Sequence, residues 1–201
     1  MPRKMASSPI ATIDVSRLKT YPLKTRNSKV KVSDFSVPWR RGGSFTKFLS
    51  SLPDILAVKT LRSLATAIAR ARRKGRPVIV GMGAHPTKVG LNPVLVDLMR
   101  RDIVTAMAFN GAVVIHDFEL ALMGHTSEEV EAEIDSGRFG MAEETGRLIN
   151  QAIVEGVRNG FGVGEAVGRY ILGRRKQFPN WKTSLLATGV KRNIPMTVHV
   201  A

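Results

Sequence analysis

Residues 77–85 read Pro-Val-Ile-Val-Gly-Met-Gly-Ala-His, a short apolar run that ends in a glycine-rich turn. The run from Pro77 to Val80 has no alternation of apolar and polar residues, which is typical of a parallel strand buried on both faces. Glycine directly after such a strand permits a tight turn and a close approach of the backbone to a ligand. The stretch therefore predicts a parallel β-sheet with a candidate site where its first strand ends.

Two further strands and a series of helices follow along the chain. Residues 104–109 form the second predicted strand, which turns at Asn110-Gly111, and residues 194–200 form the third. Helical periodicity is found over residues 58–74, 92–101, 113–123, 141–158, 163–175 and 182–190. Three N-caps are expected, at Ser44, at Asn92 and at Thr126, the last of which has capping-box spacing to Glu129. Strands that alternate with helices predict an α/β fold with a parallel sheet.

The composition limits the kinds of site and location that need consideration. The chain has 201 residues, 43% of them hydrophobic, which is enough for one substantial domain with a tail. It has no cysteine, so disulfides, thiolate zinc sites and cysteine chemistry are excluded. No apolar run approaches the roughly 20 residues that span a bilayer, and no signal peptide is recognisable. We therefore expect a cytoplasmic protein without a membrane partner.

The formal net charge of +15 is concentrated at the N-terminus. Residues 1–41 hold ten Lys and Arg and two Asp, a net charge of +8. We interpret residues 1–40 as a basic extended arm and residues 41–201 as an α/β nucleotide-binding domain. Such an arm either contacts an anionic partner or is a solvated extension. It lacks interleaved aromatic residues and any recognised nucleic-acid motif, so the sequence does not favour a nucleic-acid partner.

Two clusters of residues are candidates for chemistry. The first, residues 81–90, combines glycines with Lys88, a cation suited to a phosphate or carboxylate. Its spacing departs from the dinucleotide fingerprint, since Pro86 occupies the third glycine position, and it is not a P-loop. The alternative interpretation is that these residues only end the strand and bind no ligand.

The second cluster, His116, Asp117 and Glu119, follows the second strand. His116 and Glu119 share a helix face, and Asp117 points about 100° away. A carboxylate beside the imidazole would suit a general acid or base. The alternative is a structural histidine near a helix start, where acids are favoured by the helix dipole.

Several motifs at these positions resemble those of the bacterial deoxyhypusine synthase-like proteins, over residues 34–201. The motifs are Gly81-Met82-Gly83-Ala84-His85, Lys88-Val89-Gly90-Leu91, Phe109-Asn110-Gly111-Ala112, His116-Asp117-Phe118-Glu119, Thr126-Ser127-Glu128 and residues 139–146. The resemblance implies a Rossmann-like three-layer parallel sheet that binds NAD. It also implies oxidation of spermidine or a related amine, transfer of its aminobutyl group to a lysine or a diamine, and a homo-oligomer, by family a tetramer.

The resemblance also assigns roles to residues of the two clusters. Cofactor-binding positions are Gly81, Gly83, Ala84, His85, Lys88, Asn110, Gly111 and Ala112, and catalytic positions are His116, Asp117 and Glu119. Asp117 is the best match to an acid of the polyamine enzymes, and His116 replaces its acidic neighbour. No segment matches the family's imine-forming lysine, so we expect an N-terminal fragment whose fold is incomplete at its C-terminus. A non-enzymatic or differently specialised nucleotide- or anion-binding module on the same fold is the alternative function.

Overall fold

The computed structural model describes residues 14–200, so the first 13 residues of the expected arm lie outside the described part of the chain. The chain divides into two compact units, residues 1–62 and residues 63–201. The boundary falls inside a long helix, and each unit is described by itself.

The first unit has little regular structure. It holds two 3-10 turns, η1 (Leu23–Thr25) and η2 (Val32–Asp34), then α1 (Phe45–Ser51) and the start of α2 (Leu56–Arg73). The prediction that Ser44 caps a short helix is confirmed, because its side chain accepts a hydrogen bond from the Lys47 N–H. Arg62 fastens α2 to the preceding segment, since its guanidinium donates to the Leu49 and Leu52 carbonyls at 2.6 and 3.0 Å.

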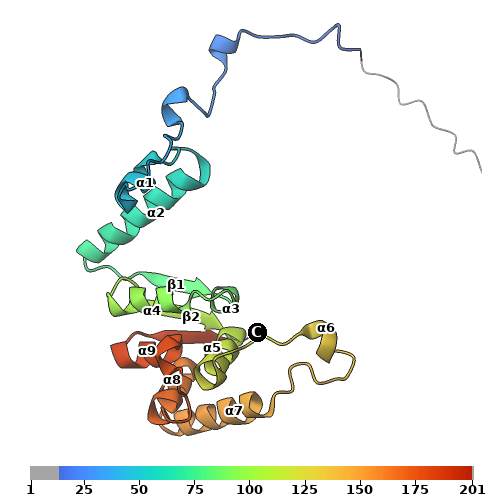
Figure 1. The fold of residues 1–201 in the computed structure, drawn as a ribbon, viewed down its shortest axis with the longest axis vertical. Helices are drawn as coiled ribbons and strands as arrows, with labels where there is room; N and C mark the ends of the chain where they lie inside the picture. Colours follow the sequence, from blue (N-terminus) through green and yellow to red (C-terminus); the bar gives the residue numbers. More distant parts are fainter. Residues whose placement is uncertain (1–13, 201) are drawn as a thin grey trace, which may run out of the picture. The chain divides into compact units, whose positions relative to one another are not determined.

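The second unit contains the predicted parallel sheet (Figure 1). Its three strands, β1 (Ile79–Met82), β2 (Ala106–Asn110) and β3 (Met196–His199), lie in that order and are all parallel. Each strand begins about two residues later than predicted, so Gly81 and Met82 belong to β1 and the turn begins at Gly83. The register pairs Met82 with Phe109 and Asn110 with His199, which brings the carboxyl ends of the strands to one edge.

The prediction that β1 is buried on both faces is wrong. Val80 and Met82 pack against the core, but Gly81 between them is exposed and Ile79 before them is 65% exposed. The same alternation occurs in β3, where Thr197 and His199 are exposed. Right-handed connections between strands in the order β1-β2-β3 place both connections on one face, which explains why only that face is covered.

Helices in the connections after β1 and β2 build the core on that face. They are α3 (His85–Lys88), α4 (Asn92–Arg100), α5 (Gly111–Met123), α6 (Val130–Glu133), α7 (Glu143–Arg158), α8 (Val163–Gly173), the 3-10 turn η3 (Trp181–Thr183) and α9 (Leu185–Arg192). Phe118, Tyr170 and Phe178 stack edge-on or tilted with centroids 5.0–6.4 Å apart, which joins α5 and α8. Gly164 allows α8 to approach β3, because a Cβ there would lie 2.6 Å from the Met196 carbonyl oxygen.

Two expected N-caps are wrong. The residue before α4 is Leu91, already in a helical conformation, and the Asn92 side chain donates to a buried carboxylate instead. Thr126 begins no helix, because the only helix in the described residues between α5 and α7 is the four-residue α6, preceded by Glu129. In both cases the side chain that was predicted to cap a helix forms a tertiary hydrogen bond instead, Asn92 to Asp117 and Thr126 to Glu119. Within residues 14–200, no helix has the length and apolar character needed to cross a bilayer.

Candidate functional site

The two predicted turns lie side by side at the carboxyl edge of the sheet. A Cβ added at Gly83 would lie 3.5 Å from the Asn110 amide nitrogen, so the turn after β1 contacts the end of β2. Both Gly83 and Asn110 are exposed. Ligands of open parallel sheets gather at this edge, and the expected pair of turns therefore occupies a position where a ligand can bind.

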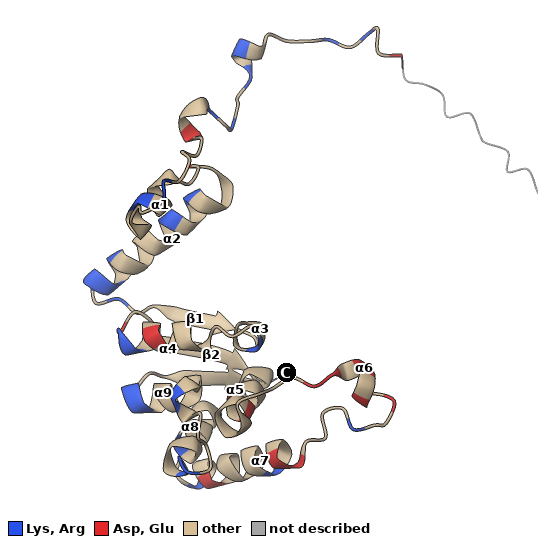
Figure 2. Cartoon of the chain, viewed as in Figure 1, with Lys and Arg blue, Asp and Glu red and all other residues tan. Residues whose placement is uncertain are grey.

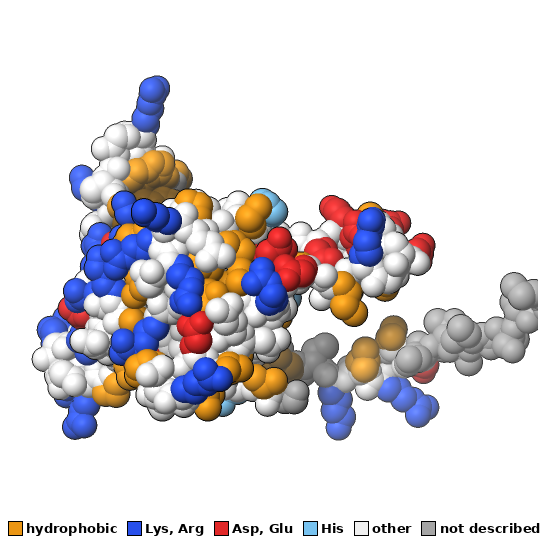
Figure 3. All heavy atoms as spheres, turned by 90° about the horizontal axis from the view of Figure 1, so that it is seen from below, with side chains coloured by type: hydrophobic (Ala, Val, Ile, Leu, Met, Phe, Trp, Pro, Cys, Tyr) orange, Lys and Arg blue, Asp and Glu red, His pale blue; other side chains and the backbone are white. Residues whose placement is uncertain are grey.

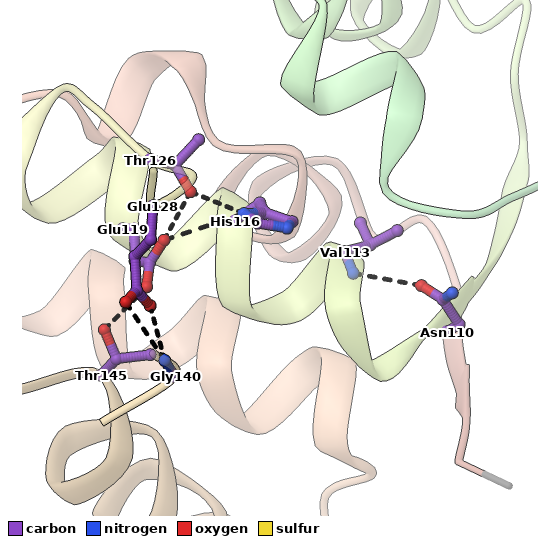
Figure 4. Close-up of polar contacts among 8 residues, drawn as sticks. All are labelled: Asn110, Val113, His116, Glu119, Thr126, Glu128, Gly140 and Thr145. Carbon is purple, nitrogen blue, oxygen red and sulfur yellow. Dashed lines mark hydrogen bonds and ion pairs between the residues drawn. The ribbon is translucent and has the colours of Figure 1, made fainter. Parts of the chain in front are cut away.

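Asn110 ends β2 and begins α5. Its side-chain oxygen accepts from the Val113 N–H at 3.2 Å, which makes it the N-cap (Figure 4). The first-turn N–H groups of Gly111 and Ala112 have no partner inside the helix, because a helix leaves its first four N–H groups unpaired. Together with the helix dipole, these groups favour an anion.

The other residues assigned to the cofactor take different positions. Ala84 is 8% exposed and is the N-cap residue of the short helix α3, and its carbonyl accepts from the Lys88 N–H. His85 and Lys88 are exposed at the two ends of α3. Gly81 lies within β1 opposite Ala108, on the uncovered face of the sheet rather than at its edge.

His116 and Glu119 share one helix face, as predicted, and a threonine connects them (Figure 4). His116 Nδ1 lies 2.6 Å from Thr126 Oγ1, and the Thr126 hydroxyl donates to Glu119 Oε2 at 2.5 Å. The other Glu119 oxygen accepts from the Thr145 hydroxyl at 2.9 Å. The carboxylate is thus held by two threonines from segments outside α5.

The hydrogen-bond network fixes the tautomer of the His116 ring. The single hydrogen of the Thr126 hydroxyl points to Glu119, so His116 Nδ1 must carry the hydrogen that it shares with Thr126. In the neutral ring, Nε2 then has a free lone pair, and no described residue is hydrogen-bonded to it. Burial lowers the pKa of His116, Glu119 opposes this shift and the Lys88 cation adds to it. The geometry is that of a neutral imidazole ready to accept a proton.

Asp117 has a different environment from the other two members of its cluster. It is fully buried and accepts four hydrogen bonds, from Asn92 Nδ2, Ser184 Oγ and the N–H groups of Leu185 and Leu186, at 2.6–3.1 Å. Burial raises the pKa of this carboxyl, and the four hydrogen bonds act in the opposite direction. Asp117 therefore caps the N-terminus of α9 from inside the core, and its contacts are structural.

A pocket of about 280 Å³ opens beside the Glu119 network. Its walls combine apolar side chains with three carboxylates and include Leu122, Met123, Ala142, Glu119, Glu128 and Glu144. The Glu128 carboxylate also accepts a hydrogen bond from the Gly140 N–H at 3.0 Å, which links the two ends of the segment between α5 and α7. No lysine or arginine lines this pocket, so its charge is negative.

The polar partners in this pocket were missed by sequence reasoning. Thr126 was assigned to a cap, and Glu128, Glu144 and Thr145 were assigned no functional role. All four, however, lie in the two stretches, residues 126–128 and 139–146, that carry the family resemblance. Their position in these motifs was the sequence signal that could have identified them. Their proximity to Glu119 depends on the fold.

Comparisons with known proteins leave the family open. No protein-family model matches the chain, and no curated protein matches it. Among solved structures, the apo form of ArgZ, an arginine dihydrolase of the ornithine-ammonia cycle in Cyanobacteria, is similar over 73% of this chain, with 20% identity and a TM-score of 0.46. The chain spans 19% of that protein's length. This similarity establishes neither a shared fold nor a shared activity. In the part of the chain that the structure describes, no group of three or more His, Asp or Glu is arranged to hold a metal ion.

Proposed function

We propose that this chain is a deoxyhypusine synthase-like module with a Rossmann-like fold, which binds NAD at the carboxyl edge of its sheet and an alkyl amine in the adjacent acidic pocket. The proposal is carried by one observation: the second edge turn, the His116 ring and the carboxylate pocket follow one another along α5, and the first edge turn contacts Asn110 at the start of that helix. The expectation of a cytoplasmic homo-oligomer belongs to the same proposal.

The residues at the edge fit the phosphates of a dinucleotide. The first turn of α5 supplies N–H groups and the positive end of a helix dipole, and Lys88 supplies a cation nearby. Gly83 allows a phosphate to approach the backbone closely, since the position that a Cβ would take there lies 3.5 Å from the Asn110 amide nitrogen. The last residue of β2 is Asn110, whose side chain is the N-cap of α5, so the chain offers no carboxylate there for a ribose hydroxyl.

The pocket fits an ammonium group on an aliphatic stem. Three carboxylates favour a cation, and Leu122, Met123 and Ala142 accommodate methylene groups. NAD, when bound, would supply the hydride acceptor for oxidation of an amine carbon. His116 is placed to take a proton at Nε2, while Thr126 and Glu119 hold its Nδ1–H and orient the ring.

A nucleotide- or anion-binding module without transfer activity is the second candidate. The observation in its favour is the Lys88 cation near the edge, which lies close enough to His116 to lower its pKa. Lys88→Ala distinguishes the two candidates: in the second, it abolishes binding of inorganic phosphate, and amines have no effect.

Calorimetry with NAD on the full chain tests the cofactor site. Gly83→Ala should fold, because its methyl group makes only an ordinary contact with Asn110, and should weaken NAD binding by about tenfold or more, near 1.4 kcal/mol. Gly81→Ala is the matched control, since a methyl there meets nothing within 4 Å and lies on the open sheet face. Absence of NAD binding at millimolar concentration would contradict the proposal.

Spermidine binding tests the acidic pocket separately. Glu144→Gln removes one lining carboxylate and should weaken binding by about tenfold, whereas Glu131→Gln, on an exposed residue of α6 outside the pocket lining, should not. If spermidine does not bind but NAD does, the amine half of the proposal is wrong and the nucleotide half stands.

A further inference from the structure

Cations from three distant stretches of sequence meet on one surface of the second unit. We define the basic strip as Arg100 and Arg101 at the end of α4, Arg175 and Lys176 after α8, and Lys191 and Arg192 at the end of α9. All six residues are exposed. Figure 2 shows the ends of α4 and α9 in blue on the same side of this unit.

Contacts among these side chains and their neighbours show that the strip is continuous. Arg175 and Lys191 both lie over the Trp181 ring, at 4.9 and 5.5 Å from its centre. Arg192 pairs with Asp102, which directly follows Arg100 and Arg101 in the chain, at 2.8 Å. The helices α4 and α9 and the turn η3 pack against one another, so the backbone that carries the cations of α4 and α9 is held in place.

Few carboxylates neutralise the strip. Asp97 pairs with Arg101 and Asp102 pairs with Arg192, which leaves a net charge of +4 from six cations and two acids. Among residues 14–200, no carboxylate lies within ion-pair distance of Arg100, Arg175 or Lys191. Arg175 and Lys176 also line a hollow of about 590 Å³. Uncompensated cations repel one another, so a polyanion at this surface would be stabilised.

The strip is distinct from the acidic part of the unit. Figure 3 shows acidic side chains gathered on the projecting segment that carries α6, whereas lysine and arginine side chains are spread over the other side. The buried Phe178, which is fully shielded from solvent, anchors the turn that carries Arg175 and Lys176. The cations are thus presented on a rigid scaffold, as they are in proteins that contact a phosphate backbone.

We infer that the basic strip binds the phosphate backbone of a nucleic acid without reading its sequence. The observation that favours this partner is the excess of cations over acids in the strip, with Arg175 and Lys191 both over the Trp181 ring, in a chain whose N-terminal arm adds net charge of the same sign. The sequence does not favour nucleic acid because it offers no motif, but the strip needs none: it is assembled by the fold. This inference is independent of the proposed cofactor and amine sites.

Fluorescence anisotropy of a labelled 20-nucleotide single strand, titrated with the full chain over a range of salt concentrations, tests the inference. The triple variant Arg100→Gln, Arg175→Gln, Lys191→Gln should bind about tenfold or more weakly, and its slope of log K against log salt should fall by about 2, or roughly 0.7 for each lost phosphate contact. The control triple variant Arg138→Gln, Arg147→Gln, Arg158→Gln has the same change of charge on or before α7.

The outcomes distinguish binding at the basic strip from nonspecific attraction to the net positive charge of the chain. Retained binding in the control variant, with loss in the strip variant, supports the inference. Equal losses in both variants, or no binding of the wild type at low salt, overturn it. Polyglutamate that competes as strongly as unlabelled oligonucleotide at equal charge also overturns it, because the partner would then be an acidic protein. Thermal unfolding of both variants confirms that they are folded.

Discussion

The environment of Asp117 leads to a prediction that separates a structural from a catalytic role. Each carboxylate oxygen accepts two hydrogen bonds: Oδ1 from Asn92 and the Leu185 N–H, Oδ2 from Ser184 and the Leu186 N–H. Asp117→Asn keeps the shape of the side chain but replaces one acceptor with a donor. Whichever oxygen is replaced, two buried donors then face an N–H₂ group.

The expected loss of stability follows from this count. A buried donor without a partner costs about 1–3 kcal/mol. The Ser184 hydroxyl can rotate, but the Leu186 N–H is fixed at the start of α9, so the lowest-cost arrangement still leaves one strained contact and one lost bond. We expect a loss of about 2–4 kcal/mol, a large fraction of the roughly 5–15 kcal/mol of a typical domain.

Urea denaturation with unchanged m-value measures this loss. Asp102→Asn is the control: Asp102 is 62% exposed, pairs with Arg192 on the surface, and should lose less than about 1 kcal/mol. Asparagine also accepts the left-handed conformation of residue 102, with φ 55°. A loss below about 1 kcal/mol for Asp117→Asn, together with abolished spermidine binding, would refute the structural account and favour the catalytic role expected from the sequence.

Two further predictions concern packing and titration. Gly164→Ala should destabilise the fold by about 1–3 kcal/mol in urea denaturation, because its Cβ would lie 2.6 Å from the Met196 carbonyl oxygen. The control is Gly146→Ala in α7, where the new methyl group meets open space and should stabilise the fold by about 0.5–1 kcal/mol. Equal effects of the two substitutions would contradict the close approach of α8 to β3. The pKa of His116 in NMR titration should lie below 6.5, rise in Lys88→Gln and fall further in Glu119→Gln. Because the pKa of His116 is lowered in the folded state, the neutral ring contributes stability above about pH 6.5, and this stability is lost as the pH falls through the folded-state pKa. In His116→Gln, this part of the pH dependence of stability should be absent. An unshifted pKa in the wild type would show that the ring is not buried as described.

The limits of sequence reasoning appear at particular residues. The parallel sheet, the long helix α2 and the shared face of His116 and Glu119 were predicted, because each depends on a local period or on residues within one turn. The exposed face of β1 was not predicted, because Ile79 is apolar like its neighbours and its exposure depends on where the connections cross.

The roles of Thr126 and Asp117 were also beyond the sequence. Thr126 has good capping-box spacing, but its hydroxyl accepts a hydrogen bond from His116 and donates one to Glu119. Asp117 looks like a companion of His116, yet its four partners include residues 67–69 positions further along the chain. Local patterns contain no information on contacts of such separation.

The sequence alone therefore determined that this chain forms strands and helices in alternation, with glycine-rich turns after the first two strands. Periodicity and turn chemistry are local properties, and they need no knowledge of the fold. Only the tertiary structure decided which side chains meet: the acidic pocket around Glu119, the buried cap at Asp117 and the basic strip around Trp181. Each of these joins elements that are distant in the chain, and their proximity follows from how the helices pack on one face of a parallel sheet.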